Sequence, residues 1–367
     1  VTLADINALA KDIITNQNQV VTLFGPAKEG FEMPANATIE KNILEAQIRK
    51  YAPYHEAKAL GDSLVTHLPK SGSILSERSY KYGYTELTLS NGMKVYVRQT
   101  DFEPDEVNLK LFSMGGKNLY PDADMPNLTY LMAGATIGGV GQYDDLALEK
   151  MLAGKTATVA PYIDDDTEGM TGTSNVKDTE TLLELVYLYF TQPRKDPQAF
   201  KSLMEQQEAF LTNAHVNPML AYNDTLHKVA YGTDRLASMD KERLKKVSYD
   251  RIMQIYKERF ASAADFKLIL TGNINLDKLR PLLCRYMAVL PSNNRTEGIG
   301  THGARLVDGK KTYVFHKEQA TPTAITTIVI KGKMEYSNRN ELLMDAIGQL
   351  LRIVYTDKVR EEKGGTY

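Results

Sequence analysis

Residues 340–367 read NELLMDAIGQLLRIVYTDKVREEKGGTY. Apolar residues recur here at steps of three and four, which predicts a helix with one buried face; they are Leu343, Ala346, Ile347, Leu350, Leu351 and Val354. The pair Gly364-Gly365 ends this helix, because glycine takes the left-handed cap conformation at little cost. The last two residues favour a strand. Arg360 and Tyr367 are therefore expected to flank one tight helix-to-strand turn.

The composition is that of a globular protein. Of 367 residues, 43% are hydrophobic and 25% are charged, and the net charge is −2. This length fits two or three domains. The nearly neutral charge and the lack of a Lys/Arg stripe predict no nucleic-acid partner, and no apolar run is long enough to predict a membrane span. The single cysteine, Cys284, excludes internal disulfides.

Residues 84–291 predict a complete α+β unit. The sequence YTELTLSNGMKVYVRQ (84–99) alternates apolar and polar residues around Asn91-Gly92, a strong hairpin signal. Because later strands come in antiparallel runs and helices in blocks, the fold class is α+β rather than a wound parallel sheet. Further strands are expected at 107–114, 156–164, 169–175 and 266–272, and helices near 125–137, 144–153, 179–192, 197–213, 247–259 and 274–290.

The flanking sequence predicts four further parts. Residues 1–27 are expected to end a preceding α+β domain, and residues 28–83 form a linker with one helix. Residues 292–303 are a second linker, polar and rich in glycine. Residues 304–367 start a second, truncated α+β domain, so we interpret the chain as a piece of a longer protein. Its expected elements are strands at 311–316 and 324–332 and a helix at 337–359.

The phrase VREEKGGTY (359–367) resembles the Arg-and-Tyr substrate motif of pitrilysin/insulysin-type zinc peptidases, the inverzincins, in their C-terminal half. Three more stretches resemble family phrases at matching places: LSNGMKVYVRQT (89–100), YKERFASAADFKLILTGNI (256–274) and LRPLLCRYMAVLPS (279–292). The resemblance implies tandem units of mainly antiparallel sheet with helices packed on one face. It also implies that Arg360 and Tyr367 are substrate-binding residues, which hold the peptide backbone across a chamber from the zinc.

The zinc motif of that family is missing. A catalytic inverzincin domain needs H-x-x-E-H on a helix, because the two His bind zinc and the Glu activates water. The six histidines are His55, His67, His215, His227, His302 and His316, and no two of them are four residues apart. Residues 122–139, where the motif would lie, contain neither His nor Glu, so Glu205 and Glu208 are expected to be solvated. We predict no catalytic residue, metal site or cofactor in this chain, and the resemblance implies zinc in an N-terminal half.

Two other metal sites were weighed. Asp164, Asp165, Asp166 and Glu168 lie between two expected strands. Their spacing is not that of an EF-hand, so a charged hairpin turn is favoured, with calcium binding as the alternative. A site built from scattered histidines such as His215 and His227 is disfavoured, since a spacing of twelve residues gives no shared helical face.

The leading hypothesis is the C-terminal, non-catalytic half of a zinc-dependent endopeptidase. It would enclose a peptide or unfolded protein and position it for a zinc site in the N-terminal half, on the same protein or on a partner subunit. The chain alone is expected to be inactive. The alternative is a non-catalytic binding or scaffold subunit of the same fold; an intact H-x-x-E-H upstream would indicate the enzyme. The compartment stays unknown, and the resemblance admits a periplasmic or cell-envelope location.

Overall fold

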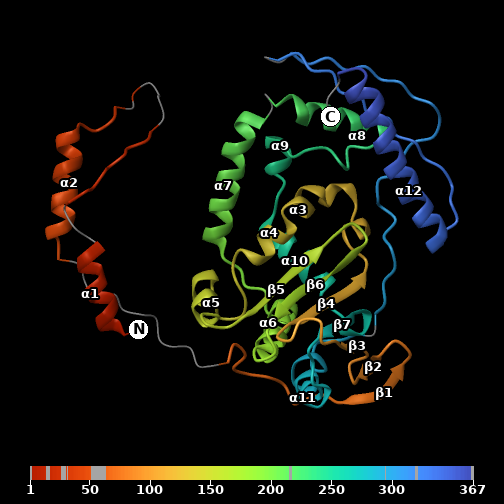
Figure 1. Ribbon diagram of the computed structural model, residues 1–367, viewed down its shortest axis with the longest axis horizontal. Coiled ribbons are helices and arrows are strands. Elements are labelled where there is room, and N and C mark those ends of the chain that lie inside the picture. The colour runs from red at the N-terminus through yellow and green to blue at the C-terminus, as the bar shows by residue number, and fades with distance from the viewer. Residues whose placement is uncertain are drawn as a thin grey trace. The chain divides into compact units, whose positions relative to one another are not determined.

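The computed structural model describes residues 2–13, 17–25, 30, 32–50, 63–214, 217–293, 295–318 and 321–364. The chain divides into two compact units, residues 1–59 and 60–367. The first unit contains α1 (Leu3–Ile13) and α2 (Asn36–Ile48) (Figure 1). Helix α2 buries none of its side chains. It is the helix expected within the first linker.

The second unit is built on one seven-stranded sheet with the order β1-β2-β3-β7-β4-β6-β5. Neighbouring strands are antiparallel except β3 and β7, which are parallel. This mainly antiparallel sheet confirms the predicted α+β class. Its strands are β1 (Ile74–Tyr80), β2 (Tyr84–Leu89), β3 (Lys94–Gln99), β4 (Val107–Met114), β5 (Ala157–Ile163), β6 (Thr167–Ser174) and β7 (Lys267–Gly272).

The predicted hairpin joins β2 to β3. Gly92 has a φ of +89°, the left-handed region that favours glycine. The Asn91 side chain ties this turn to the end of the unit: its Nδ2 donates to the carbonyls of Met287 (2.8 Å) and Leu290 (3.1 Å). Its Oδ1 accepts from the Met93 N–H at 3.2 Å. One turn residue therefore links the start of the chain's sheet to residues almost two hundred positions later.

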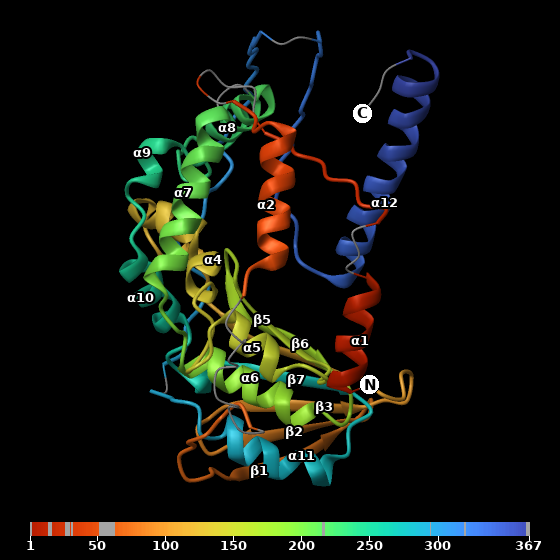
Figure 2. The same ribbon diagram turned by 90° about the vertical axis from the view of Figure 1, so that its left-hand side faces the viewer.

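Helices complete the second unit. Helix α6 is the most deeply buried of the described helices, with nine buried residues, and it packs on β5 and β6 (Figure 2). The helices are α3 (Met125–Thr129), α4 (Leu131–Thr136), α5 (Asp145–Met151), α6 (Thr179–Thr191), α7 (Pro197–Ala214), α8 (Pro218–Tyr231), α9 (Lys241–Leu244), α10 (Tyr249–Arg259) and α11 (Leu276–Leu282), the last continued by a π-helical turn at Leu283–Met287. Short 3-10 turns lie at Lys117–Leu119, Asp122–Asp124 and Ala263–Asp265. None of the described helices is long and apolar enough to cross a bilayer.

The sequence analysis missed helix α8, although its ends carry clear signals. Asn217 caps its first turn by accepting the Met219 N–H at 2.9 Å, and proline follows at the first helical position. Gly232 ends it with a φ of +66°. The helix was overlooked because its apolar stripe is weak, so local caps were its best signal.

Two expectations about sheet strands were wrong. The sheet begins at Ile74, inside the range expected to be a linker, rather than at residue 84. Residues 311–316 and 324–332 form no described strand. A strand requires hydrogen bonds to a neighbouring strand, and no described strand lies beside either segment. Their apolar side chains are exposed, including Val314 and Ile330.

We predict that Asn91→Ala lowers the free energy of unfolding by about 1–3 kcal/mol, because two buried carbonyls and one N–H lose their partner. Urea unfolding followed by circular dichroism measures this change. The exposed Asn223→Ala is the control and should change stability by less than about 0.5 kcal/mol. Equal effects of the two substitutions would contradict this role of the turn.

Candidate functional site

Arg360 lies in the π-helical turn Thr356–Glu361, directly after helix α12 (Asn338–Tyr355). Its side chain is 58% exposed, with Nε 3.6 Å from the Glu361 carboxylate. The Gly364 N–H donates to the Arg360 carbonyl at 3.1 Å, and Gly364 has a φ of +65°. The predicted glycine cap is therefore present. Tyr367 lies outside the described residues, so its pairing with Arg360 stays a prediction.

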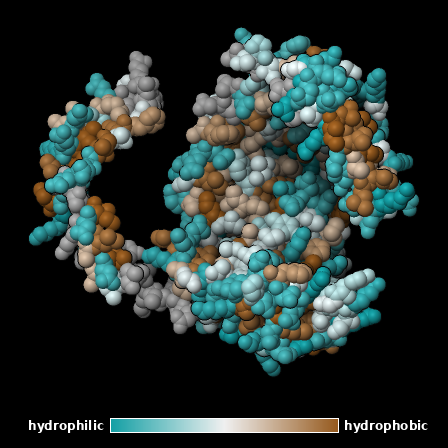
Figure 3. Space-filling model, viewed as in Figure 1, coloured by the Kyte–Doolittle hydropathy of each residue, from teal (hydrophilic) through white to brown (hydrophobic). Residues whose placement is uncertain are grey.

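Helix α12 forms where it was expected, with Ser337 as its N-cap. The expectation of a buried face was wrong for the described structure. The apolar stripe is exposed, because no described element covers it, and apolar side chains gather over this helix in Figure 3. The exposed residues include Leu343, Ile347, Leu350, Leu351 and Val354.

The place of the missing zinc motif is occupied by packing contacts. Asp124 accepts two hydrogen bonds from Arg251, at 2.7 and 3.0 Å. Asn127 is buried and accepts the Ser248 N–H at 2.8 Å. The Tyr130 hydroxyl donates to Gln207 at 3.3 Å. These polar groups fasten α3 and its neighbours to α10 and α7, and they do not fit a zinc ion.

No group of three or more His, Cys, Asp or Glu in the described part of the chain could hold a metal. Glu205 and Glu208 are exposed, as expected. The Nδ1 atom of His227 lies 3.3 Å from the Leu236 carbonyl. His215 is outside the described residues, so a site containing it is not tested.

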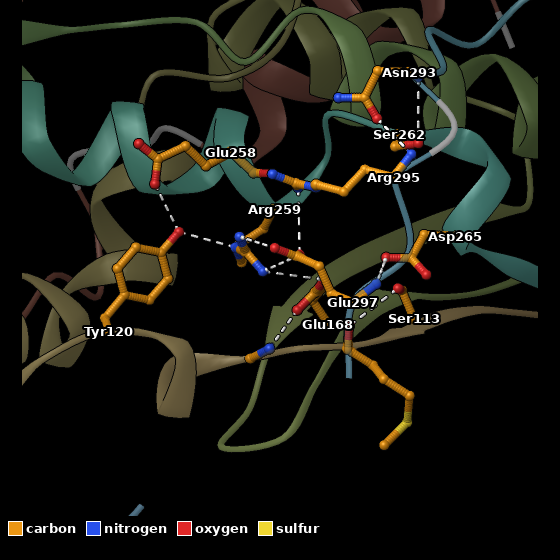
Figure 4. A network of polar contacts seen from close by, with 12 residues as sticks. Ser113, Tyr120, Glu168, Glu258, Arg259, Ser262, Asp265, Asn293, Arg295 and Glu297 are labelled. Carbon is orange, nitrogen blue, oxygen red and sulfur yellow. Dashed lines mark hydrogen bonds and ion pairs between the residues drawn. The ribbon is translucent and has the colours of Figure 1, made fainter. Parts of the chain in front are cut away.

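The acidic run at the β5–β6 turn contains one buried member. The Asp164 N–H donates to the Thr167 carbonyl at 2.8 Å, which confirms the hairpin turn. Glu168, however, is only 1% exposed, so this member of the charged turn is buried. It accepts the Gly116 N–H at 2.6 Å and lies 3.8 Å from the guanidinium of Arg259 (Figure 4).

Arg259 is the centre of this buried network. It is the last residue of α10 and is 5% exposed. Its guanidinium donates twice to Glu297, at 2.6 and 3.2 Å, and its Nε donates to the Tyr120 hydroxyl at 2.9 Å (Figure 4). That hydroxyl donates in turn to Glu258 at 2.9 Å. This network was not expected from the sequence, since its hydrogen-bonded partners are separated by up to 139 residues; the arginine in the last helical turn was the only local hint.

Burial dominates the electrostatics of the network. It raises the pKa of Glu168 to about 7, although the Gly116 N–H and the Arg259 charge oppose this change. Burial opposes the charge of Arg259, but the hydrogen bond to Glu297 and the nearby Tyr120 and Glu168 raise its pKa on balance. Burial also raises the pKa of Tyr120. A carboxyl group that titrates near neutral pH marks either a functional site or a structural network.

The geometry favours a structural role for Glu168. It lines neither the cavity of about 810 Å³ between α8 and residues 306–331 nor the one of about 480 Å³ beside α10. In the larger cavity, the Tyr222 hydroxyl lies 2.6 Å from Thr327 Oγ1. The Val307 N–H donates to the Ala230 carbonyl at 2.8 Å. The extended segments after residue 304 are thus attached to α8.

We predict that Glu168 makes stability depend on pH. Its pKa is higher in the folded chain (about 7) than its ordinary 4.5, so the folded chain holds the extra proton between these values. The free energy of unfolding therefore falls by roughly 3 kcal/mol as pH rises through this window. Urea unfolding between pH 5 and 8 measures this change. In Glu168→Gln the free energy of unfolding should not show the fall. Glu103 is exposed, so Glu103→Gln should show the same fall as the wild type. A pH profile of stability in Glu168→Gln that matches the wild type would contradict the role given to Glu168.

Comparison with known proteins shows which of them are similar to this chain. Residues 246–367 match the model of the Peptidase M16 inactive domain. The probable zinc protease PqqL of Haemophilus influenzae is 23% identical over 303 residues, covering 80% of this chain and 32% of the relative. A zinc protease PQQL-like protein of Arabidopsis thaliana is 26% identical over 298 residues, covering 77% and 28%. The probable zinc protease PqqL of Escherichia coli is 22% identical over 348 residues, covering 93% and 36%.

Two solved structures share the fold. The periplasmic protease PqqL from Escherichia coli aligns with a TM-score of 0.60 at 19% identity, over 75% of this chain and 30% of that one. A mutant of the ferredoxin protease FusC, in complex with Arabidopsis ferredoxin, aligns with a TM-score of 0.55 at 18% identity and the same coverage. The chain thus spans 28–36% of the length of these curated relatives. The chain is similar to the PqqL zinc proteases over most of its length, and its residues 246–367 match the Peptidase M16 inactive domain.

Proposed function

We propose that this chain serves in the C-terminal, non-catalytic half of an M16 zinc endopeptidase. There it would enclose a peptide or unfolded protein and position it for a zinc site in the N-terminal half. The observation that carries the proposal is the match of residues 246–367 to the inactive M16 domain. The sequence supports it, because it contains no H-x-x-E-H.

In this proposal Arg360 and Tyr367 bind the substrate backbone. The Arg360 guanidinium donates to a substrate carbonyl, a charge-assisted hydrogen bond stronger than a neutral one. The Tyr367 hydroxyl donates near the scissile peptide, where it stabilises the developing oxyanion. Two features support the role of Arg360: its side chain is largely exposed, and its carbonyl is held by the Gly364 cap.

The partner of this chain would be the N-terminal half, on the same protein or on another subunit. Zinc belongs to that half, since the residues at the corresponding place here do not fit it. We also propose a periplasmic location, from the likeness to the periplasmic protease PqqL. The alternative function is a non-catalytic scaffold of the same fold. The relatives favour the enzyme, because all three are described as zinc proteases.

The proposal is tested by steady-state kinetics of the whole protein that contains both halves. Arg360→Ala should reduce kcat/KM for an unstructured peptide by about 10- to 100-fold, as expected when a charged hydrogen bond to substrate is lost. Tyr367→Phe should reduce kcat more than it raises KM, because its bond strengthens in the transition state. Zinc content should not change in either variant.

The matched control is Arg352→Ala, which removes an exposed arginine of α12, two turns before Arg360. It should leave kcat/KM within about twofold of the wild-type value, as surface substitutions usually do. Equal losses for Arg352→Ala and Arg360→Ala would remove Arg360 from the substrate site. Normal activity without Tyr367 would do the same for the tyrosine.

A further inference from the structure

Residues 295–303, RTEGIGTHG, follow the α+β body in the range expected to be a Gly-rich linker; we call them the strap. The strap lies against the body instead of hanging free. Arg295 donates to the Glu258 carbonyl at 2.8 Å, and the Glu297 N–H donates to Asp265 at 3.0 Å. The His302 N–H donates to the Asn118 carbonyl at 3.0 Å. The strap is therefore fastened near both of its ends.

Glycine allows the strap to lie so close. A Cβ atom built at Gly300 would stand 2.0–2.3 Å from the backbone of residues 118–119. One at Gly303 would stand 2.8 Å from the Asn118 side chain. Backbone atoms cannot yield to such overlap, so position 300 requires a residue without a side chain, whereas at position 303 the Asn118 side chain would have to shift. The Gly-rich composition indicated a flexible linker. In the structure these glycines also allow the strap to pack closely against the body.

The tightest fastening is the double hydrogen bond from Arg259 to Glu297. The arginine is 5% exposed, and the side chain of Glu297 is 18% exposed, so this ion pair is largely shielded from water and salt. The Tyr120 ring supports the guanidinium from one side, 5.3 Å from its centroid. Glu168, on β6, faces the same guanidinium.

We propose that Arg259 and Glu297 are positioning residues that clasp the strap to the body, and that ionisation of Glu168 loosens this clasp. The clasp would fix where residues 304–364 begin, because the next attachments follow on α8, at Val307 and Thr327. The consequence for Arg360 rests on the proposed function, whereas the clasp itself does not.

The charged groups around Glu168 explain why its ionisation would loosen the clasp. The groups that face it or its partners are the Gly116 N–H before the first 3-10 turn, Tyr120 after that turn, Tyr162 on β5, Arg259 on α10, Asp265 in the turn after α10, and Arg295 and Glu297 on the strap. With Glu168 protonated, two guanidinium groups balance the two carboxylates of Asp265 and Glu297. Once Glu168 ionises, three carboxylates share the same two cations. Glu168 and Glu297 then compete for Arg259.

In this competition Glu297, on the strap, is the carboxylate that moves away from Arg259. Glu168 is held within β6 by ladder hydrogen bonds to β4 and β5. Glu297 belongs to a segment with no helix or strand, so it can move at lower cost. Burial raises the pKa of Glu168 to about 7, which places the change between mildly acidic and mildly alkaline pH.

The test is amide hydrogen exchange of the whole chain at pH 6.0 and 8.5, with each rate divided by the intrinsic rate at that pH. In the wild type, the protection of amides in the strap, including His302, should fall roughly tenfold at pH 8.5, the effect of a competing charge equivalent to one pKa unit. Glu168→Gln should abolish that fall. Glu297→Gln should leave the strap poorly protected at both pH values.

The matched control is Glu258→Gln. Its carboxylate belongs to the same network and accepts from Tyr120, Arg251 and Gln254, but the strap bonds only to its backbone carbonyl. Strap protection should therefore match the wild type. The exchange of the β7 amides reports whether a variant has unfolded the α+β body. If Glu297→Gln or Glu258→Gln is unfolded, the comparison of strap protection in the wild type and in Glu168→Gln decides.

Equal strap protection at both pH values in the wild type would overturn the role of Glu168. Strap protection in Glu297→Gln equal to that in Glu258→Gln would overturn the clasp. Neither readout needs peptide or zinc. Loss of the proposed substrate role in the kinetic test would therefore leave this result intact, and a failed clasp would leave that test readable.

Discussion

Strand β7 is the constraint on which the rest of the second unit depends. It pairs in parallel with β3 and antiparallel with β4, so it joins two three-stranded parts of the sheet that are otherwise separate. Leu268 and Leu270 on this strand are completely buried. Helix α10 and the turn that follows it lead directly into β7. Whatever fixes the end of α10 therefore also fixes the middle of the sheet.

Arg259 supplies that fixed point. A buried arginine is stable only where carboxylates and hydrogen-bond acceptors surround it, and here Glu168 and Glu297 approach it from the sheet and the strap. The same few atoms connect the body to the C-terminal segment. Polar contacts hold α3, α4 and their flanking residues to α10 and α7. The chain has the fold of a peptidase domain, and these polar groups hold its helices together.

The sequence predicted those features that depend on neighbouring residues. The hairpin at Asn91-Gly92, helix α12 and its glycine cap follow from local periodicity and turn chemistry, and so does the α+β class. Whether residues 311–316 and 324–332 pair as strands, and whether Glu168 is buried, depends on partners distant in sequence, which no local pattern reports. The proposed substrate role of Arg360 comes from family resemblance and stays a prediction, whereas the network around Arg259 required the three-dimensional arrangement. Caps were the available signal for α8.

The most direct test of the non-catalytic assignment is the zinc content of the purified chain, measured by atomic absorption together with cleavage of a fluorogenic peptide. We expect no zinc above the trace level of a chelator-washed sample and no cleavage. Stoichiometric zinc with chelator-sensitive cleavage would contradict it, because the chain would then contain a catalytic metal site.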